Sequence, residues 1–292
     1  MTQVGPFEII DVPPLDEPRM LVALQPWVDV GSVGTMALTF LEETFGGQPI
    51  GELTRPGRFY DFTRYRPTLF RREGKREVSI PNTRLHHARD KQDRDWLLLH
   101  ALEPHANGDE YTEGVLGLCK HFNVSEYALV GSMYAPVPHT RPPIASGGAN
   151  DETTLARLRQ AGVRESNYEG PTTILATVTT EADKLGMTTS GLILQLPAYA
   201  QLERDYTGLH ALLGYLDAMF GFGLSLDQLG EQSERQTEAI NESVSDDPHL
   251  KAWLAELETA YDAERPGEAP ADDTPLSPEL ESFLRDIERK MD

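Results

Sequence analysis

The segment that decides the fold is YALVGSMYAPVPHTRPP, residues 127–143. It starts with the uncharged, mostly apolar run YALVG, which has the length and composition of a buried strand. It continues into a loop punctuated by prolines, each of which fixes its own φ angle and favours an extended conformation in the residue before it. The loop therefore displays His139, Thr140 and Arg141 on a stiff backbone. Because open α/β sheets carry their sites at the carboxyl ends of strands, this junction is a candidate site.

The composition of the chain is that of an ordinary globular protein. Its 292 residues, 39% of them hydrophobic, suffice for one large domain or for one domain with an appendage. The formal net charge is −21. Such a charge disfavours binding to nucleic acid or to an anionic membrane, because both interactions depend on clustered Lys and Arg.

The sequence gives three indications of the cellular compartment. Cys119 is the single cysteine, so no intrachain disulfide can form, and a reducing compartment fits. The first residues, MTQVGPFEII, lack the basic and apolar regions of a signal peptide. No window approaches the roughly 18 apolar residues that cross a bilayer. We expect a cytoplasmic protein.

Strand patterns alternate with helical patterns along most of the chain. Strands are predicted at residues 7–12, 20–24, 50–53, 68–72, 76–80, 96–102, 127–131 and 187–196. Helices are predicted at residues 32–45, 111–122, 151–161, 172–185, 209–220, 226–243, 249–261 and 278–290. The alternation predicts an α/β fold with a mostly parallel or mixed central sheet, followed by a helical C-terminal extension.

The acidic charge is concentrated near the C-terminus. Residues 225–292 contain 19 Asp or Glu and 6 Lys or Arg. We expect an α/β domain at residues 1–224 and an acidic helical extension at residues 225–292, with a linker at about residues 265–275. The simplest interpretation of the charge is a solvated helical face.

The loop ends of the predicted sheet carry a recurring set of short motifs. They are PWVDVGSVG (26–34), FYDF (59–62), RP (66–67), EP (103–104), VPHTRP (137–142), YEGPT (168–172) and LPAYAQ (196–201). In this order and spacing the motifs resemble the PAC2 family, the proteasome assembly chaperone 2-like proteins of archaea and actinobacteria. The resemblance covers roughly residues 20–230, and the combination of PHTRP with YEGPT is its specific part.

The resemblance implies a phosphorylase/hydrolase-like three-layer α/β sandwich, related in shape to purine nucleoside phosphorylases. It also implies a homo-oligomer, with a trimer favoured, and a chaperone-like role linked to the proteasome. It implies no reaction.

Two departures from the family pattern bear on function. The first loop of the family usually contains two carboxylate or amide residues between its Trp and its Gly, whereas here Asp29 is the one carboxylate, which weakens a metal or acid–base role. Relatives that dock on the proteasome end in a hydrophobic-Tyr-any residue tail. This chain ends in Arg-Lys-Met-Asp, so docking by such a tail is not expected.

Several polar residues fall at predicted strand-to-loop junctions. The ligand-binding candidates are Trp27, Asp29, Gly31, Asp61, His139, Thr140, Arg141, Tyr168 and Glu169, and the catalytic candidates are His139, Glu103 and Glu169. In a ligand pocket, Arg141 would bind an oxyanion together with the amides that follow Gly31, and His139 would act as general acid or base. In a structural alternative, Arg141 pairs with Asp61 or Glu103 and holds the loops together.

No catalytic or metal-binding role is predicted for the cysteine or for the other histidines considered. Cys119 lies on the apolar face of a predicted helix and is expected in the core. His86, His87 and His121 have no partner at metal-ligand spacing, so no metal site and no cofactor are predicted.

Two functions remain open at this point. The first is a non-catalytic PAC2-like protein that acts through protein–protein interaction, as a homo-oligomer with a possible proteasome-related partner. The second is an enzyme or binding protein for a nucleoside-like or phosphorylated small molecule, which uses the loop of His139 and Arg141.

Overall fold

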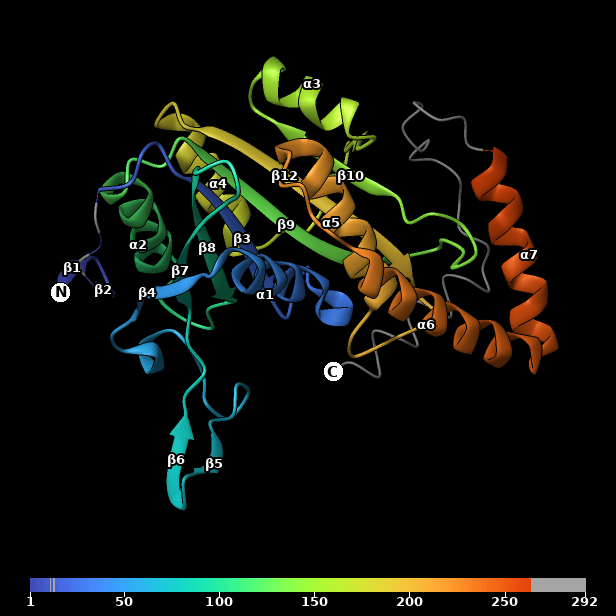
Figure 1. Ribbon diagram of the computed structural model, residues 1–292, viewed down its shortest axis with the longest axis horizontal. Coiled ribbons are helices and arrows are strands. Elements are labelled where there is room, and N and C mark those ends of the chain that lie inside the picture. Colours follow the sequence, from blue (N-terminus) through green and yellow to red (C-terminus); the bar gives the residue numbers. More distant parts are fainter. Residues whose placement is uncertain (11, 13, 264–292) are drawn as a thin grey trace.

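The computed structural model describes residues 1–10, 12 and 14–263 (Figure 1). Ten strands form one sheet in the order β1-β2-β4-β7-β8-β3-β9-β12-β10-β11. The strands of this sheet are β1 (Thr2–Val4), β2 (Phe7–Ile9), β3 (Arg19–Gln25), β4 (Gln48–Leu53), β7 (Arg84–Arg89), β8 (Asp95–Leu102), β9 (Glu126–Ala135), β10 (Ala145–Ala149), β11 (Arg164–Glu165) and β12 (Thr188–Pro197).

The centre of the sheet is parallel and its flanks are mainly antiparallel. Strands β8, β3, β9 and β12 are parallel neighbours, whereas β7 runs antiparallel to β8 and β10 runs antiparallel to β12. Val22 of β3 lies between Leu99 of β8 and Leu129 of β9. The central strands are apolar along nearly their whole length because helices cover both of their faces. The sheet is therefore mixed.

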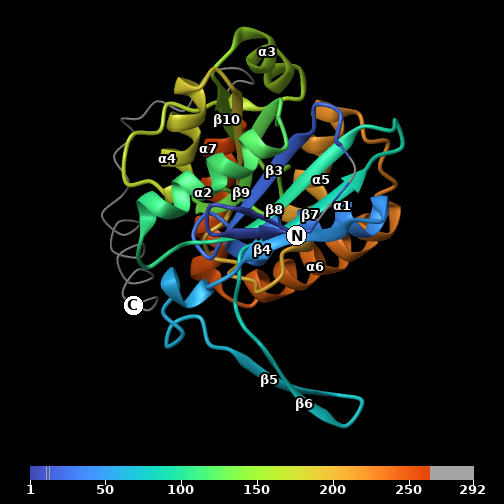
Figure 2. The same ribbon diagram turned by 90° about the vertical axis from the view of Figure 1, so that its left-hand side faces the viewer.

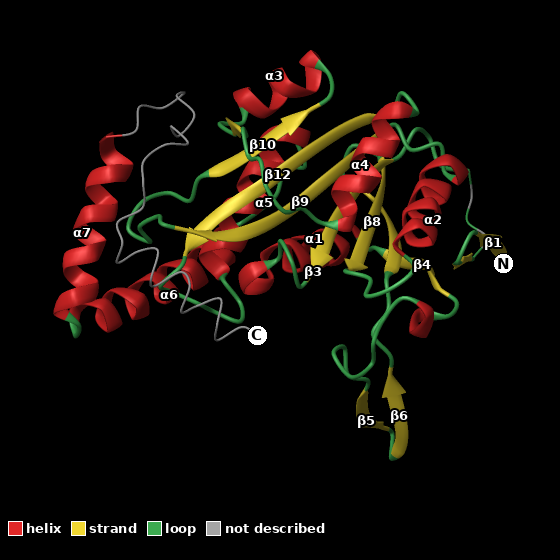
Figure 3. Ribbon diagram, turned by 180° about the vertical axis from the view of Figure 1, so that it is seen from behind, coloured by secondary structure: helices red, strands yellow, loops and turns green. Residues whose placement is uncertain are grey.

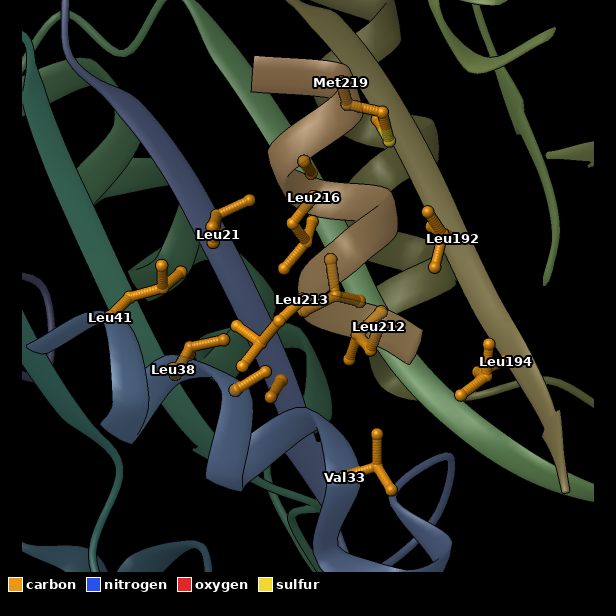
Figure 4. Close-up of a cluster of buried hydrophobic side chains, with 14 of the residues drawn as sticks. Leu21, Val33, Leu38, Leu41, Leu192, Leu194, Leu212, Leu213, Leu216 and Met219 are labelled. Atoms are coloured by element: carbon orange, nitrogen blue, oxygen red, sulfur yellow. The ribbon is translucent and has the colours of Figure 1, made fainter. Parts of the chain in front are cut away.

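Helices cover the sheet on both faces, which gives three layers. The helices are α1 (Val33–Phe45), α2 (Gly108–His121), α3 (Glu152–Gln160), α4 (Ile174–Lys184), α5 (Tyr206–Phe220), α6 (Asp227–Ser245) and α7 (Pro248–Ala263). Helices α1, α3 and α5 contribute to one buried apolar cluster, and α2 and α4 contribute to the other (Figure 3). In Figure 4, Leu213 and Leu216 of α5 point toward the sheet and α1. The three-layer α/β arrangement confirms the predicted fold class.

Local sequence signals set several helix ends. The side chain of Asp151 accepts a hydrogen bond from the backbone N–H of Thr154 and so caps α3, as its position predicts. Gly46 ends α1 in the left-handed conformation that glycine adopts at little cost.

The two last described helices extend beyond the sheet. Helix α6 packs on α5, where Gln236 Oε1 accepts a hydrogen bond of 2.7 Å from the backbone N–H of Tyr206. Helix α7 follows after a turn at Asp246 and Asp247 (Figure 1). The C-terminal helices confirm a helical extension. The predicted linker at 265–275 and the helix at 278–290 lie outside the described residues.

A separate hairpin projects from the body of the molecule. It consists of β5 (Thr68–Arg72) and β6 (Lys75–Ser79), joined at Glu73 and Gly74, and it belongs to no larger sheet. Figures 1 and 2 both show it standing away from the helices and the main sheet. We call residues 66–80 the arm. The sequence predicted this hairpin from its turn.

Four strands were not predicted, and the first of them is the three-residue strand β1. Strand β7 has the sequence RLHHAR, and β10 has the sequence ASGGA, neither of which is a clear apolar or alternating run. The last is the two-residue strand β11. Strand β9 also runs to Ala135, beyond the predicted end at residue 131. Of the helices described, none combines the length and the apolar character that crossing a membrane requires.

Candidate functional site

The carboxyl ends of the four parallel strands meet at one edge of the sheet. Glu103 follows β8, Asp29 follows β3, His139 follows β9, and Tyr199 follows β12. The strand order thus brings residues from four distant segments to the edge where the sequence predicts a site. Their side chains have different hydrogen-bond partners.

Asp29 acts as the N-terminal cap of α1. Its Oδ1 accepts hydrogen bonds from the backbone N–H groups of Gly34 (2.6 Å) and Thr35 (3.1 Å), and its Oδ2 accepts one from the Thr35 hydroxyl (2.6 Å). Burial raises the pKa of Asp29 to about 6, although these hydrogen bonds oppose the shift. The hydroxyl of Ser32, the residue before α1, instead donates to the backbone carbonyl of Glu203.

Close packing against Asp205 requires a glycine at position 31. Its φ is +62°, and an added Cβ would lie 2.7 Å from Cβ of Asp205, beside the start of α5. The backbone N–H of Asp205 also donates to the carbonyl of Gly31 at 2.9 Å. The amides of Gly34 and Thr35 already donate to Asp29, so these two of the amides that follow Gly31 are not free to bind an oxyanion.

His139 is buried and bonded through both ring nitrogens. The Tyr199 hydroxyl lies 2.6 Å from Nδ1 of His139 and 2.8 Å from its backbone nitrogen, and Nε2 lies 2.9 Å from Oδ1 of Asn241. All these groups are satisfied when the hydroxyl accepts from the backbone N–H and donates to Nδ1, while Nε2–H donates to Asn241. Burial lowers the pKa of His139, against the opposing effects of Asn241 and Glu258. The neutral imidazole is therefore the form held by the structure.

Thr140 and Arg141 bind carboxylates of α7. The guanidinium of Arg141 contacts both carboxylate oxygens of Asp262, at 2.8 and 2.7 Å, and lies 3.3 Å from Oε1 of Glu258. The Thr140 hydroxyl donates to the same Glu258 oxygen at 2.5 Å. The predicted pairing of Arg141 with Asp61 or Glu103 is wrong, because α7 supplies the partners from more than a hundred residues further along the chain.

Glu103 and Asp61 lie in other surroundings. Oε1 of Glu103 accepts a hydrogen bond of 3.1 Å from the backbone N–H of Ile174, the first residue of α4. Burial raises the pKa of Glu103, and this hydrogen bond opposes the shift. Asp61 is exposed, and its Oδ1 accepts a local hydrogen bond of 2.8 Å from the backbone N–H of Thr63.

The remaining candidates are exposed. Trp27 and Tyr168 keep 58% and 62% of their surface accessible, and Glu169 is exposed as well. The Tyr168 hydroxyl donates to the carbonyl of Pro171, so its bond is local. The structure does not gather these three side chains around His139.

The cavity beside His139 is small. It has a volume of about 20 Å³ and borders Pro138, His139 and Arg141, which leaves room for about one water molecule. A larger, open groove of about 470 Å³ lies between α4 and strands β9, β10 and β12. Its lining contains one ionisable side chain, Asp183, which accepts a hydrogen bond from Asn150.

The sequence missed the partners that complete these contacts. Asn241, Glu258 and Asp262 lie on helices whose charge pattern indicates a solvated face, so no local signal distinguishes them. Sequence spacing also gave no metal-ligand partner for His86, because its neighbours in space come from other elements. Strand pairing and α1 bring Glu42, His86 and His100 together, with one ligating atom of each within 4.8 Å of the others. Cys119 is buried in the core, as predicted.

The family model named PAC2 family matches residues 23–244. The chain belongs to the PAC2 family. Because the matched region runs from β3 into α6, it includes every strand end of the candidate edge. Among curated proteins, none matches this chain.

Solved structures of bacterial proteins share this PAC2 fold. A protein of unknown function from Corynebacterium glutamicum superposes with a TM-score of 0.79 at 20% identity, over 88% of this chain and 97% of that one. A PAC2 family protein from Streptomyces avermitilis gives 0.73 at 25% identity, over 81% and 99% of the two chains. A proteasome-assembly chaperone homologue from Mycobacterium tuberculosis gives 0.71 at 27% identity, over 80% and 99%.

Proposed function

We propose that this PAC2 protein acts without catalysis, through protein–protein interaction, in a chaperone-like role linked to the proteasome. The main structural support for this proposal is the arm, whose exposed apolar and basic side chains suit a protein partner. The likeness to the mycobacterial proteasome-assembly chaperone homologue supports the link to the proteasome.

Among the described residues, the arm is a separate two-stranded sheet, and it exposes apolar side chains. Leu69 and Val78 face each other across the two strands, with 61% and 58% of their surfaces accessible, and Ile80 extends the same apolar strip. A two-stranded hairpin is only marginally stable in water by itself. Exposed apolar side chains on such an element fit a surface that becomes buried by a partner.

The charges of the arm also fit an external partner. Arg71 lies opposite Arg76, and Arg72 lies opposite Lys75. Like charges in directly opposed positions destabilise a hairpin, so these pairs do not serve the arm itself. Residues 66–80 contain five Lys or Arg and two Glu, in a chain of net charge −21. The arm is therefore a basic element that suits an acidic surface.

Helix α6 of a second copy of the chain offers such a surface. Five exposed carboxylates follow one another at helical spacing along it: Asp227, Glu231, Glu234, Glu238 and Glu242. We call them the acidic stripe. The arm and α6 project from different parts of the molecule (Figure 1). Contact between the arm of one copy and the stripe of the next is head-to-tail, and a head-to-tail contact that closes forms a ring, such as the trimer that the family resemblance favours.

The geometry around His139 favours this function over a small-molecule site. The guanidinium of Arg141 already binds two carboxylates, and both ring nitrogens of His139 have partners. A cavity of about 20 Å³ is far below the several hundred Å³ of ordinary ligand pockets.

A charge-swap experiment tests the contact between the arm and the stripe. Native mass spectrometry and light scattering would compare the wild type with the double variant Arg71→Glu/Arg76→Glu, which keeps a like-charged pair in the hairpin. We expect the wild type to be oligomeric and the variant monomeric. Adding Glu234→Lys and Glu238→Lys to this variant should restore the oligomer, and Arg71→Lys/Arg76→Lys should leave it intact.

A monomeric wild type, or an oligomer that survives the charge reversal, would reject the arm as the interface. The link to the proteasome has a separate test, in which the tagged chain is isolated from its own cells and its partners are identified by mass. Proteasome subunits should co-purify with the wild type. If they are absent, the proteasome link fails, whatever the outcome for the oligomer.

A further inference from the structure

Three ligand-type side chains meet on the α1 face of the sheet. In the pairing of β7 with β8, His86 lies opposite Leu98, and His100 is two residues further along β8. The two histidines are therefore diagonal neighbours on one face. Helix α1 contacts both strands and contributes Glu42 from its last turn.

The reactive atoms converge on one carboxylate oxygen. Oε1 of Glu42 lies 3.0 Å from Nδ1 of His86 and 2.5 Å from Nε2 of His100. The side chains are 16–20% exposed, so a bound species would be shielded yet reachable from solvent. The imidazole rings stand nearly perpendicular, at 87°, with their centroids 5.4 Å apart.

One of these atoms lacks a satisfactory partner. Nδ1 of His86 is buried and makes no hydrogen bond of acceptable geometry with the described part of the chain, although it lies 3.0 Å from Oε1 of Glu42. A buried polar atom of this kind carries a free-energy cost. A species that accepts the nitrogen lone pair would remove that cost.

We propose that Glu42, His86 and His100 bind a divalent cation of the zinc type, with water in the fourth position. Two imidazole nitrogens and one carboxylate oxygen form a ligand set that zinc takes when a coordination position stays open. Mg²⁺ and Ca²⁺ are disfavoured because they prefer sites made of oxygen atoms alone.

The ligand atoms must move slightly before a zinc ion can bind between them. Zinc binds its ligands at about 2.0–2.2 Å, so neighbouring ligand atoms of a tetrahedral site lie about 3.4 Å apart. The carboxylate oxygen must therefore move slightly away from the two nitrogens, which the flexible side chain of Glu42 permits. The ion then replaces the hydrogen bond between Glu42 and His100, and it joins the end of α1 to β7 and β8.

Calorimetry with tag-free, chelator-treated full-length chain tests the site, with ZnCl₂ as the titrant. We expect saturable binding of one Zn²⁺ per chain. The melting temperature should rise by about 5 °C at free Zn²⁺ a hundred times above Kd. His86→Gln and His100→Gln should each weaken binding at least tenfold, and Glu42→Gln should weaken it as well.

His87→Gln is the matched control. His87 is the next residue of β7, is comparably buried and contacts a different carboxylate, Asp95. Its replacement should leave the affinity for zinc unchanged. Absence of saturable binding to the wild type would overturn the proposal, as would equal binding by the His86 and His100 variants.

A second readout uses the wild type alone and so does not depend on the folding of variants. Co²⁺ in a tetrahedral site gives intense visible absorption, and we expect this spectrum on titration of the chain with CoCl₂, with Zn²⁺ displacing it. A spectrum of octahedral, hydrated Co²⁺ throughout the titration would overturn the proposal.

Discussion

The loop at His139 and the arm use polar residues in opposite ways. In the loop, Tyr199 and Asn241 satisfy His139, and carboxylates of α7 bind Arg141. In the arm, arginine faces arginine and two large apolar side chains face solvent. The loop carries a histidine, a residue type common in catalysis, but its side chains bind other parts of the same chain. The arm carries no histidine, and its apolar and like-charged side chains are exposed.

This difference indicates where interactions with other molecules occur. A polar group with all its hydrogen bonds made gains little from a ligand, because binding would first break the existing bonds. An exposed apolar pair and a cluster of like charges both gain from a complementary partner. Changes in the loop should therefore alter stability, and changes in the arm should alter association.

The largest effect is expected for the apolar pair of the arm. Leu69→Ser combined with Val78→Ser should weaken self-association by about 4 kcal/mol, or roughly a thousandfold in Kd, because both side chains would be buried by the partner. The free energy of unfolding should change by no more than about 0.5 kcal/mol per surface substitution. Sedimentation and denaturant unfolding measure the two quantities. A large loss of folding stability would place these side chains in a structural role instead.

The next effect concerns the pH dependence of stability at Asp29. Its pKa in the folded chain, about 6, is above the ordinary value of 3.8, so the folded state binds the proton more tightly than the unfolded state. The contribution of Asp29 to the free energy of unfolding is therefore most favourable below pH 4. It decreases by about 3 kcal/mol as the pH rises to about 6.

Asp29→Asn tests this prediction because the amide oxygen can still cap α1. Relative to the wild type, the variant should gain stability as the pH rises from 4 to 7, which urea unfolding at several pH values measures. Asp93→Asn, a change of an exposed carboxylate, is the control. Parallel stability profiles of the wild type and Asp29→Asn would refute the raised pKa.

A smaller effect is expected at Tyr199. Tyr199→Phe removes the hydroxyl that bonds both the ring and the backbone N–H of His139, and it leaves buried polar atoms unpaired. The cost should be about 2 kcal/mol of folding stability. The oligomeric state should not change, because the arm is untouched. Loss of the oligomer in this variant would contradict the separation of the two regions.

The smallest effect is expected at Arg141. Arg141→Met removes ion pairs with Glu258 and Asp262, which are partly exposed and thus screened by water. The melting temperature should fall slightly at low salt, and the difference should vanish at high salt. Arg159→Met, which also loses two carboxylate partners, is the control. A difference that persists at high salt would show that Arg141 stabilises the loop by packing rather than by charge.

Much of the fold follows from local sequence signals. The apolar runs of β3 and β8 identify central strands because each is buried on both faces, and shorter apolar runs identify β9 and β12. The Glu73-Gly74 turn identifies the hairpin of the arm, since both residues adopt positive φ angles. Strand β7 was missed because its side chains alternate in no clear apolar pattern, and its place in the sheet comes from pairing with β4 and β8.

The sequence by itself determined the α/β fold, the PAC2 resemblance and the edge at which Asp29, Glu103 and His139 emerge. All of these depend on periodicity and on short motifs within single segments. Only the tertiary structure decided what each side chain contacts. The carboxylates that bind Arg141 come from α7, and the cluster of Glu42, His86 and His100 spans a helix and two strands. Contacts between segments so far apart in the chain depend on how layers pack and strands pair, which no local pattern encodes.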